Sequence, residues 1–115
     1  MFLGKEVRVI LRGDALNSFL ELKKKNDQNS LRIIKSIDRV IEILKQNPQF
    51  GDPIRKEIIP NEFIKIGIRN LYRVELSNYW RLIYTLEGNR IEIFAFVLKI
   101  FDHQDYNKLF GYKRR

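Results

Sequence analysis

Two arginines in strand-like segments are the residues best suited to phosphate chemistry. Arg81 is the second residue of the run WRLIYTL, and Arg73 lies earlier, in LYRVEL. A guanidinium carries a planar fork of N–H donors that fits a phosphate better than an ammonium does. The two arginines are therefore candidates for binding a phosphate, with Arg73 brought near Arg81 through a short turn at Ser77–Tyr79. The alternative for Arg81 is an ion pair with Glu75 across the hairpin.

The candidates for proton transfer lie near the C-terminus. His103 is the single histidine of the chain, and Tyr106 follows three positions later in a segment with helical spacing. Residues at that spacing share one face of a helix. An imidazole exchanges its proton near neutral pH, which makes His103 the best acid or base in the sequence. The simpler interpretation is a surface or capping histidine, with the ring of Tyr106 packed inside.

Two lysines complete the set of predicted phosphate-binding or RNA-binding residues. Lys99 stands where the last apolar run ends, and Lys65 lies in the less regular middle of the chain. An ammonium neutralises phosphate charge without a bidentate grip. An ordinary solvated lysine explains either position equally well.

The composition disfavours several other classes of site. The chain has 115 residues, no cysteine and one histidine, so we expect no disulfide, no metal centre and no cofactor. No apolar run approaches the roughly 18 residues of a membrane span, and no signal-peptide pattern opens the sequence. We therefore expect a cytoplasmic protein. Its 22 Lys and Arg against 14 Asp and Glu give a net charge of +8, which favours a nucleic acid or an acidic protein as partner.

The first half of the chain is expected to be mainly helical. Alternating apolar residues predict a strand over Lys5–Leu11, and Asp14 is then placed to cap a helix that runs to about Lys25. After the polar break Asn26–Ser30, isoleucines and leucines recur at intervals of three and four. This spacing predicts a second amphipathic helix that stops near Asn47, before a proline. The short link favours an antiparallel helical hairpin.

The second half is expected to be mainly strands. Residues 54–69 give no clear pattern and are interpreted as irregular or short extended structure. The runs LYRVEL, WRLIYTL and RIEIFAFVLKI then predict an antiparallel meander, with a turn at Glu87–Asn89 where Gly88 and Asn89 tolerate positive φ. Asp102 is placed to cap a short C-terminal helix.

These segments predict one α+β domain over residues 1–115. An N-terminal strand and an antiparallel two-helix hairpin are expected to pack on an antiparallel sheet of about four strands, with a short C-terminal helix.

The segment YWRLIYTLEGNRIEIFAFVLKI resembles the RelE/ParE superfamily of toxins from toxin–antitoxin operons. These proteins show an aromatic residue or glycine, then Arg, then a strand ending in Tyr, a turn and a final apolar strand. NLYRVELSNYWRLIYT followed by DHQDYNKLFGYK is similar to a RelE-like subgroup, and the resemblance spans nearly the whole chain.

The resemblance implies a metal-independent ribonuclease that cuts messenger RNA on the ribosome, together with an antitoxin protein that neutralises it. Cleavage of this type is an attack by a ribose 2′-OH on the adjacent phosphate, which leaves a 2′,3′-cyclic phosphate. Arg81 matches the strand arginine that acts on the scissile phosphate, and Arg73 and Lys99 lie near positions where relatives hold RNA. His103 and Tyr106 match a terminal His and Tyr that transfer protons.

Two alternatives stay open at this point. The first is a ParE-like toxin that inhibits DNA gyrase without catalysis. The second is a RelE-fold protein whose activity has decayed, leaving a binder of RNA or antitoxin. Ile100, where an arginine is expected, and the sparse basic residues of LYRVEL favour the second alternative.

Overall fold

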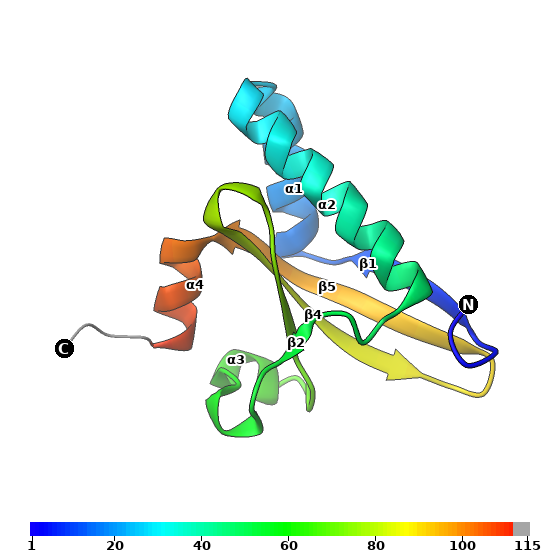
Figure 1. The fold of residues 1–115 in the computed structure, drawn as a ribbon. Coiled ribbons are helices and arrows are strands. Elements are labelled where there is room, and N and C mark those ends of the chain that lie inside the picture. The colour runs from blue at the N-terminus through cyan, green and yellow to red at the C-terminus, as the bar shows by residue number, and fades with distance from the viewer. Residues whose placement is uncertain (112–115) are drawn as a thin grey trace.

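A mixed sheet of five strands forms the centre of the computed structural model, which describes residues 1–111. The strands lie side by side in the order β1-β5-β4-β3-β2 (Figure 1). The elements in chain order are β1 (Glu6–Leu11), α1 (Asp14–Lys25), α2 (Gln28–Gln46), β2 (Asp52–Pro53), the 3-10 turn η1 (Lys56–Ile58), α3 (Asn61–Ile64), β3 (Tyr72–Glu75), the 3-10 turn η2 (Ser77–Tyr79), β4 (Trp80–Gly88), β5 (Glu92–Asp102) and α4 (His103–Phe110). The expected α+β architecture is confirmed.

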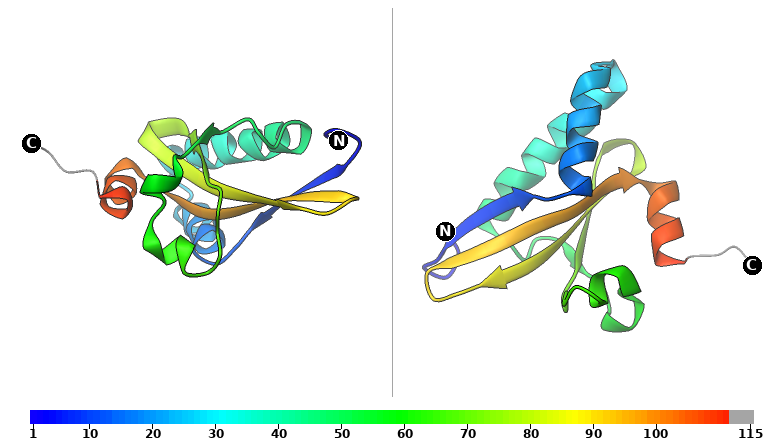
Figure 2. Two further views of the ribbon diagram at one scale, coloured as in Figure 1. Left: turned by 90° about the horizontal axis from the view of Figure 1, so that it is seen from below. Right: turned by 180° about the vertical axis from the view of Figure 1, so that it is seen from behind.

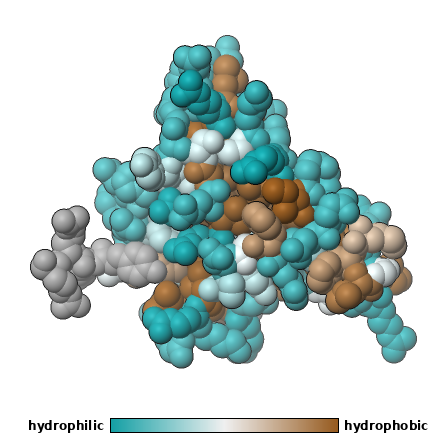
Figure 3. All heavy atoms as spheres, viewed as in Figure 1, coloured by the Kyte–Doolittle hydropathy of each residue, from teal (hydrophilic) through white to brown (hydrophobic). Residues whose placement is uncertain are grey.

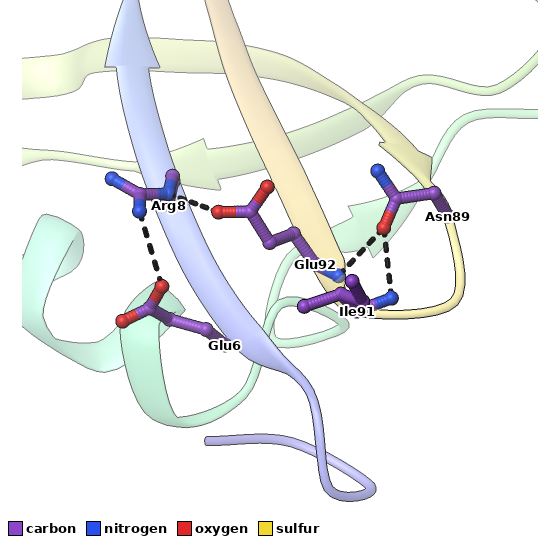
Figure 4. Close-up of polar contacts among 5 residues, drawn as sticks. All are labelled: Glu6, Arg8, Asn89, Ile91 and Glu92. Atoms are coloured by element: carbon purple, nitrogen blue, oxygen red, sulfur yellow. Dashed lines mark hydrogen bonds and ion pairs between the residues drawn. The ribbon is translucent and has the colours of Figure 1, made fainter.

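The first strand differs from expectation in its direction. β1 pairs with β5 in parallel, whereas β3, β4 and β5 form the expected antiparallel meander. Parallel neighbours need a long crossover, and here most of the chain lies between the two strands. Arg8 of β1 bonds the carboxylate of Glu92 on β5 and pairs with Glu6 at 3.2 Å (Figure 4). The bond between Arg8 and Glu92 joins the two strands at their exposed end.

The helical hairpin forms as predicted, with different caps. Gly13 is the N-cap of α1, and its neighbour Asp14 provides no side-chain cap, so the predicted role of Asp14 is wrong. The next helix begins at Gln28 because Asp27 caps it, its carboxylate accepting the Ser30 N–H at 2.7 Å. That bond lowers the pKa of Asp27. The end of α2 just before Pro48 agrees with the prediction.

Each face of the sheet has its own apolar core. α2 covers one face, and α1 packs beside it against β5; the main buried residues of this core are Leu22, Ile33, Ile37, Val40, Leu44, Leu82, Tyr84, Val97 and Ile100. α3, η1 and α4 cover the opposite face, whose buried residues are Ile59, Phe63, Leu71, Ile83 and Tyr106. Figure 2 shows α2 on one side of the sheet and α3 on the other. The second core explains why residues 54–69 fold at all: the expected irregular segment contains the turn η1 and the helix α3, which buries Phe63.

The turn between β4 and β5 lies later than predicted. Gly88 is still in β4, and neither Gly88 nor Asn89 has a positive φ. Instead the Asn89 side chain accepts the backbone N–H groups of Ile91 and Glu92, each at 2.8 Å (Figure 4). An asparagine side chain thereby closes the turn without left-handed backbone.

Candidate functional site

The two predicted arginines lie on the same face of the sheet. Arg73 of β3 stands opposite Ile83 of β4, and Glu75 stands opposite Arg81. Cross-strand partners and alternate residues point to one side, so the two arginine side chains project together. This is the face covered by α4, because Ile83 belongs to the same core as Tyr106.

Tyr106 holds the two guanidiniums near each other. Their central carbons lie 5.9 Å (Arg73) and 5.5 Å (Arg81) from the centre of its ring, within cation–π range. The Tyr106 hydroxyl also accepts a hydrogen bond from Arg73 Nη1 at 3.3 Å. The ring packs against Phe101 and Phe110, and only 2% of the residue is exposed. A short C-terminal helix thus supplies an aromatic support for a pair of cations on the sheet.

The positive charge of this pair is only loosely neutralised. Arg81 Nη2 lies 3.9 Å from Glu75, and Arg73 Nη2 lies 3.7 Å from Asp52; both carboxylates are largely exposed. Exposed pairs of this kind contribute little. The hydrogen bond to Tyr106 raises the pKa of Arg73, although burial opposes it.

Both arginines also keep hydrogen-bonding capacity. Within residues 1–111, the buried Nε of Arg73 and that of Arg81 have no hydrogen-bond partner. The side chain of Arg81 remains 18% exposed, and the ion pair with Glu75 that was considered as its alternative is present at 3.9 Å. Two guanidiniums beside one aromatic ring, each paired only with an exposed carboxylate, form an anion-binding arrangement.

His103 lies at the same end of the sheet. It is the exposed first residue of α4, directly after Asp102, whose carboxylate caps the helix by accepting the Asp105 N–H at 2.9 Å. The ring of His103 meets that of Tyr79 edge to face at 5.7 Å. Arg81 Nη1 in turn donates to the Tyr79 carbonyl at 3.1 Å. Tyr79 therefore links the candidate acid–base residue to the candidate phosphate-binding arginine.

The two predicted lysines are not part of this group. Lys99 stands opposite Ile83 on β4, and its ammonium pairs with the carboxylates of Asp14 and Glu62 at 2.7 and 3.5 Å. Burial lowers the pKa of Lys99, but these two carboxylates outweigh it and raise the pKa overall. Two cavities, of about 490 and 530 Å³, flank this ion pair, and neither is lined by Arg73 or Arg81.

Lys65 and Ile100 also lie apart from the arginines. Lys65 is the C-cap of α3, where its backbone N–H donates to the Asn61 carbonyl at 2.9 Å, and its side chain is exposed. Ile100 is 1% exposed in the core beneath α2, so an arginine there would not reach this site.

Two residues that the sequence analysis did not select join the site. Arg55 lines a cavity of about 230 Å³ together with Arg73 and Tyr106. It falls in the segment whose pattern was unreadable, and only the β2–β3 pairing brings it near Arg73. Tyr79 lies in the turn before β4, the strand that carries Arg81. The one sequence feature that could have indicated it is an aromatic residue directly after Asn78 in this turn.

Among residues 1–111, no three His, Cys, Asp or Glu side chains gather in a way that could hold a metal ion. Within the same range, no helix has the length and apolar character needed to span a membrane.

The comparisons with known proteins identify the fold. The chain superposes on the solved structure of a YoeB/ParE toxin from Agrobacterium tumefaciens with a TM-score of 0.57 and 11% sequence identity. The match covers 84% of this chain and 98% of that chain. No protein-family model and no curated protein matches the sequence. The α+β fold expected from the sequence is thus confirmed, and it is similar to the fold of that toxin.

Proposed function

We propose that this protein is a RelE-like toxin that cuts messenger RNA on the ribosome and so inhibits translation. The observation that carries the proposal is the pair formed by Arg73 and Arg81 over the ring of Tyr106, with His103 close by. The toxin fold and the net charge of +8 support it. A loosely neutralised arginine pair fits a phosphodiester better than it fits a neutral small molecule.

Each residue has a role that follows from its position. In the attack of a 2′-OH on the neighbouring phosphate, negative charge builds up on the phosphoryl oxygens. Arg81, half-buried and held by the Tyr79 carbonyl, is placed to stabilise that charge. Arg73 binds the same or the adjacent phosphate. His103, exposed at the edge of the group, takes the proton from the 2′-OH or gives one to the departing 5′ oxygen.

Two residues of the predicted set receive other roles. Tyr106 is buried and accepts from Arg73, so we assign it the positioning of the arginines in place of proton transfer. Lys99 is held by two carboxylates, so we assign it the joining of β5 to the helices in place of phosphate binding. Lys65 remains available only as a peripheral RNA contact.

The proposal includes a small acidic antitoxin that binds the basic protein, and it places both in the cytoplasm with the ribosome. Exposed apolar residues support a protein partner. Figure 3 shows one group of apolar residues near the N-terminal tip, in addition to apolar patches near the centre and the lower edge of the same face. Met1, Leu3 and Ile91 of that region are each more than 70% exposed, with values of 73%, 84% and 74%. Exposed apolar groups of this kind commonly mark protein interfaces.

The test is to map cuts in messages that are being translated and in the same messages free in solution. The wild type is compared with Arg81→Ala and with a matched control, Arg90→Ala, which removes an exposed arginine from the distant β4–β5 turn. We expect cuts only in translated messages. They are abolished by Arg81→Ala and unchanged by Arg90→Ala.

Other outcomes identify the competing functions. Equal activity of the two variants would contradict the role of Arg81. Absence of cuts combined with inhibition of DNA supercoiling by gyrase would indicate the ParE-like function. Absence of both activities, with antitoxin binding retained, would indicate a decayed enzyme.

A further inference from the structure

The turn before the arginine strand has an unusual backbone. Asn78 and Tyr79 both have positive φ, 57° and 64°, and the Trp80 N–H bonds the Ser77 carbonyl across them. Two central residues with positive φ characterise the tight hairpin turns that favour Asn followed by Gly. Asn78 fits the first position. Tyr79 occupies the second, where glycine adopts the conformation without strain.

The ring that this backbone carries is exposed. Tyr79 has 72% of its surface accessible to solvent. A bulky aromatic residue in a left-handed conformation is an outlier, and here burial of the ring does not compensate for it. The second apolar core does not use the ring. Backbone strain that persists without a packing benefit is typical of functional sites.

The neighbours of Tyr79 point to nucleic acid. Its carbonyl accepts from Arg81, and its ring lies edge-on against that of His103 at 5.7 Å. A nucleotide whose phosphate lies on Arg81 would have its base within reach of the exposed ring. Stacking on an aromatic side chain accepts any base, because every base has a π face.

We propose that Tyr79 is a stacking platform for the base beside the phosphate that Arg81 binds, and that the strained turn is retained because it holds the ring there. The inference rests on the proposed function in taking RNA as the ligand. Its partner is an unpaired nucleotide of single-stranded RNA. Tyr79 is accordingly a binding residue that orients the RNA for Arg81 and His103.

The test measures binding of a single-stranded RNA of about 12 nucleotides, within the range of single-strand sites, made with 2′-O-methyl riboses so that no cut occurs. A second strand of the same length lacks the central bases but keeps every phosphate. The variants are Tyr79→Leu, Tyr79→Gly and the matched control Tyr79→Phe, which keeps the ring. We expect Tyr79→Leu and Tyr79→Gly to weaken binding of the intact strand about tenfold.

The two controls make the result specific. On the strand without central bases, all variants should bind as the wild type does, since the phosphate contacts remain. Tyr79→Phe should bind the intact strand like the wild type. Tyr79→Gly should also unfold at the same or a higher temperature than the wild type, because glycine relieves the positive φ. A higher thermal midpoint together with weaker RNA binding would show that the turn is maintained for the ligand.

Several results would overturn the proposal. The first is equal binding of the intact strand by Tyr79→Leu and Tyr79→Phe. The second is an equal loss of binding affinity on both strands, and the third is no binding of the intact strand by the wild type. Unchanged RNA binding with loss of binding to an acidic antitoxin would assign the ring to a protein interface instead. If the ribosomal cuts occur but the Leu variant binds normally, the stacking fails while the proposed function stands. If no ribosomal cuts occur but Tyr79→Leu loses affinity for the intact strand alone, the stacking role stands and the proposed function fails.

Discussion

Replacing Tyr106 by phenylalanine separates support of the arginines from proton transfer. The change leaves the ring under Arg73 and Arg81, at 5.9 and 5.5 Å, and removes only the hydroxyl that accepts from Arg73 at 3.3 Å. A hydrogen bond to a charged group contributes about 1.5–3 kcal/mol. Because this bond is long, at 3.3 Å, we take its contribution as about 1 kcal/mol, which corresponds to a roughly fivefold lower cutting rate.

Tyr106→Leu provides the stronger perturbation. It removes the hydroxyl and also two cation–π contacts, each contributing about 0.5–1 kcal/mol at partly exposed sites. Together with the lost hydrogen bond, the expected loss is about 2–3 kcal/mol, or roughly 30- to 150-fold in rate. The packing of the ring against Phe101 and Phe110 is lost as well, so this variant should also be less stable.

The assay is the single-turnover rate of cutting of a ribosome-bound message, with urea unfolding of each variant measured in parallel. We expect the wild type to cut fastest, Tyr106→Phe to cut a few-fold more slowly, and Tyr106→Leu to cut much more slowly. If the hydroxyl transferred the proton, the Phe variant would lose about 10²–10⁴-fold. A Phe variant as slow as the Leu variant would therefore refute the positioning role.

Two further predictions concern the scaffold beneath the site. Tyr84→Phe should lower the free energy of unfolding by about 2 kcal/mol, because it leaves the buried Pro48 carbonyl and Gly51 N–H, bonded to the hydroxyl at 2.6 and 2.9 Å, without partners. Burial raises the pKa of Tyr84 to about 12. The neutral hydroxyl's contribution to the free energy of unfolding is therefore complete below the usual tyrosine pKa near 10 and is lost as the pH rises through 12. The difference in unfolding free energy between wild type and Tyr84→Phe, followed by urea titration, should narrow in that range. A difference that widens would contradict the assignment. Lys99→Met should lower stability by about 1 kcal/mol through the lost pairs with Asp14 and Glu62 and should leave the cutting rate within about threefold of wild type. A large loss of rate at full stability would return Lys99 to the phosphate site.

Local patterns predicted the elements well where one physical rule dominates. The apolar spacing of α1 and α2, the proline after α2 and the cap at Asp102 each act within a few residues, and the structure confirms all of them. Caps and turns with several equivalent candidates were less certain. Gly13 took the place of Asp14 as the N-cap, and the Asn89 side chain closed a turn that had been expected to need positive φ.

The long-range features could not be read from the chain. A parallel β1–β5 pair depends on contacts between residues far apart, as in the bond between Arg8 and Glu92. The bond between Lys99 and Asp14, 85 residues apart, is equally invisible in the spacing of LKI. For the site, the short turn between the two strands predicted that Arg73 lies near Arg81. No periodicity could put the buried Tyr106 ring beside both arginines or bring Arg55 next to Arg73.

The most direct test of the central claim is the chemistry of the cut ends. A ribosome-bound message is incubated with the protein, and the 3′ ends of the upstream fragments are identified by mass spectrometry. An otherwise identical message carries a single 2′-O-methyl group at the cut position. We expect 2′,3′-cyclic phosphate ends on the unmodified message and no cut in the 2′-O-methyl message. With Arg81→Ala, we expect neither message to be cut. Cuts that persist at the 2′-O-methyl position, or ends that carry a free 3′-OH, would contradict it.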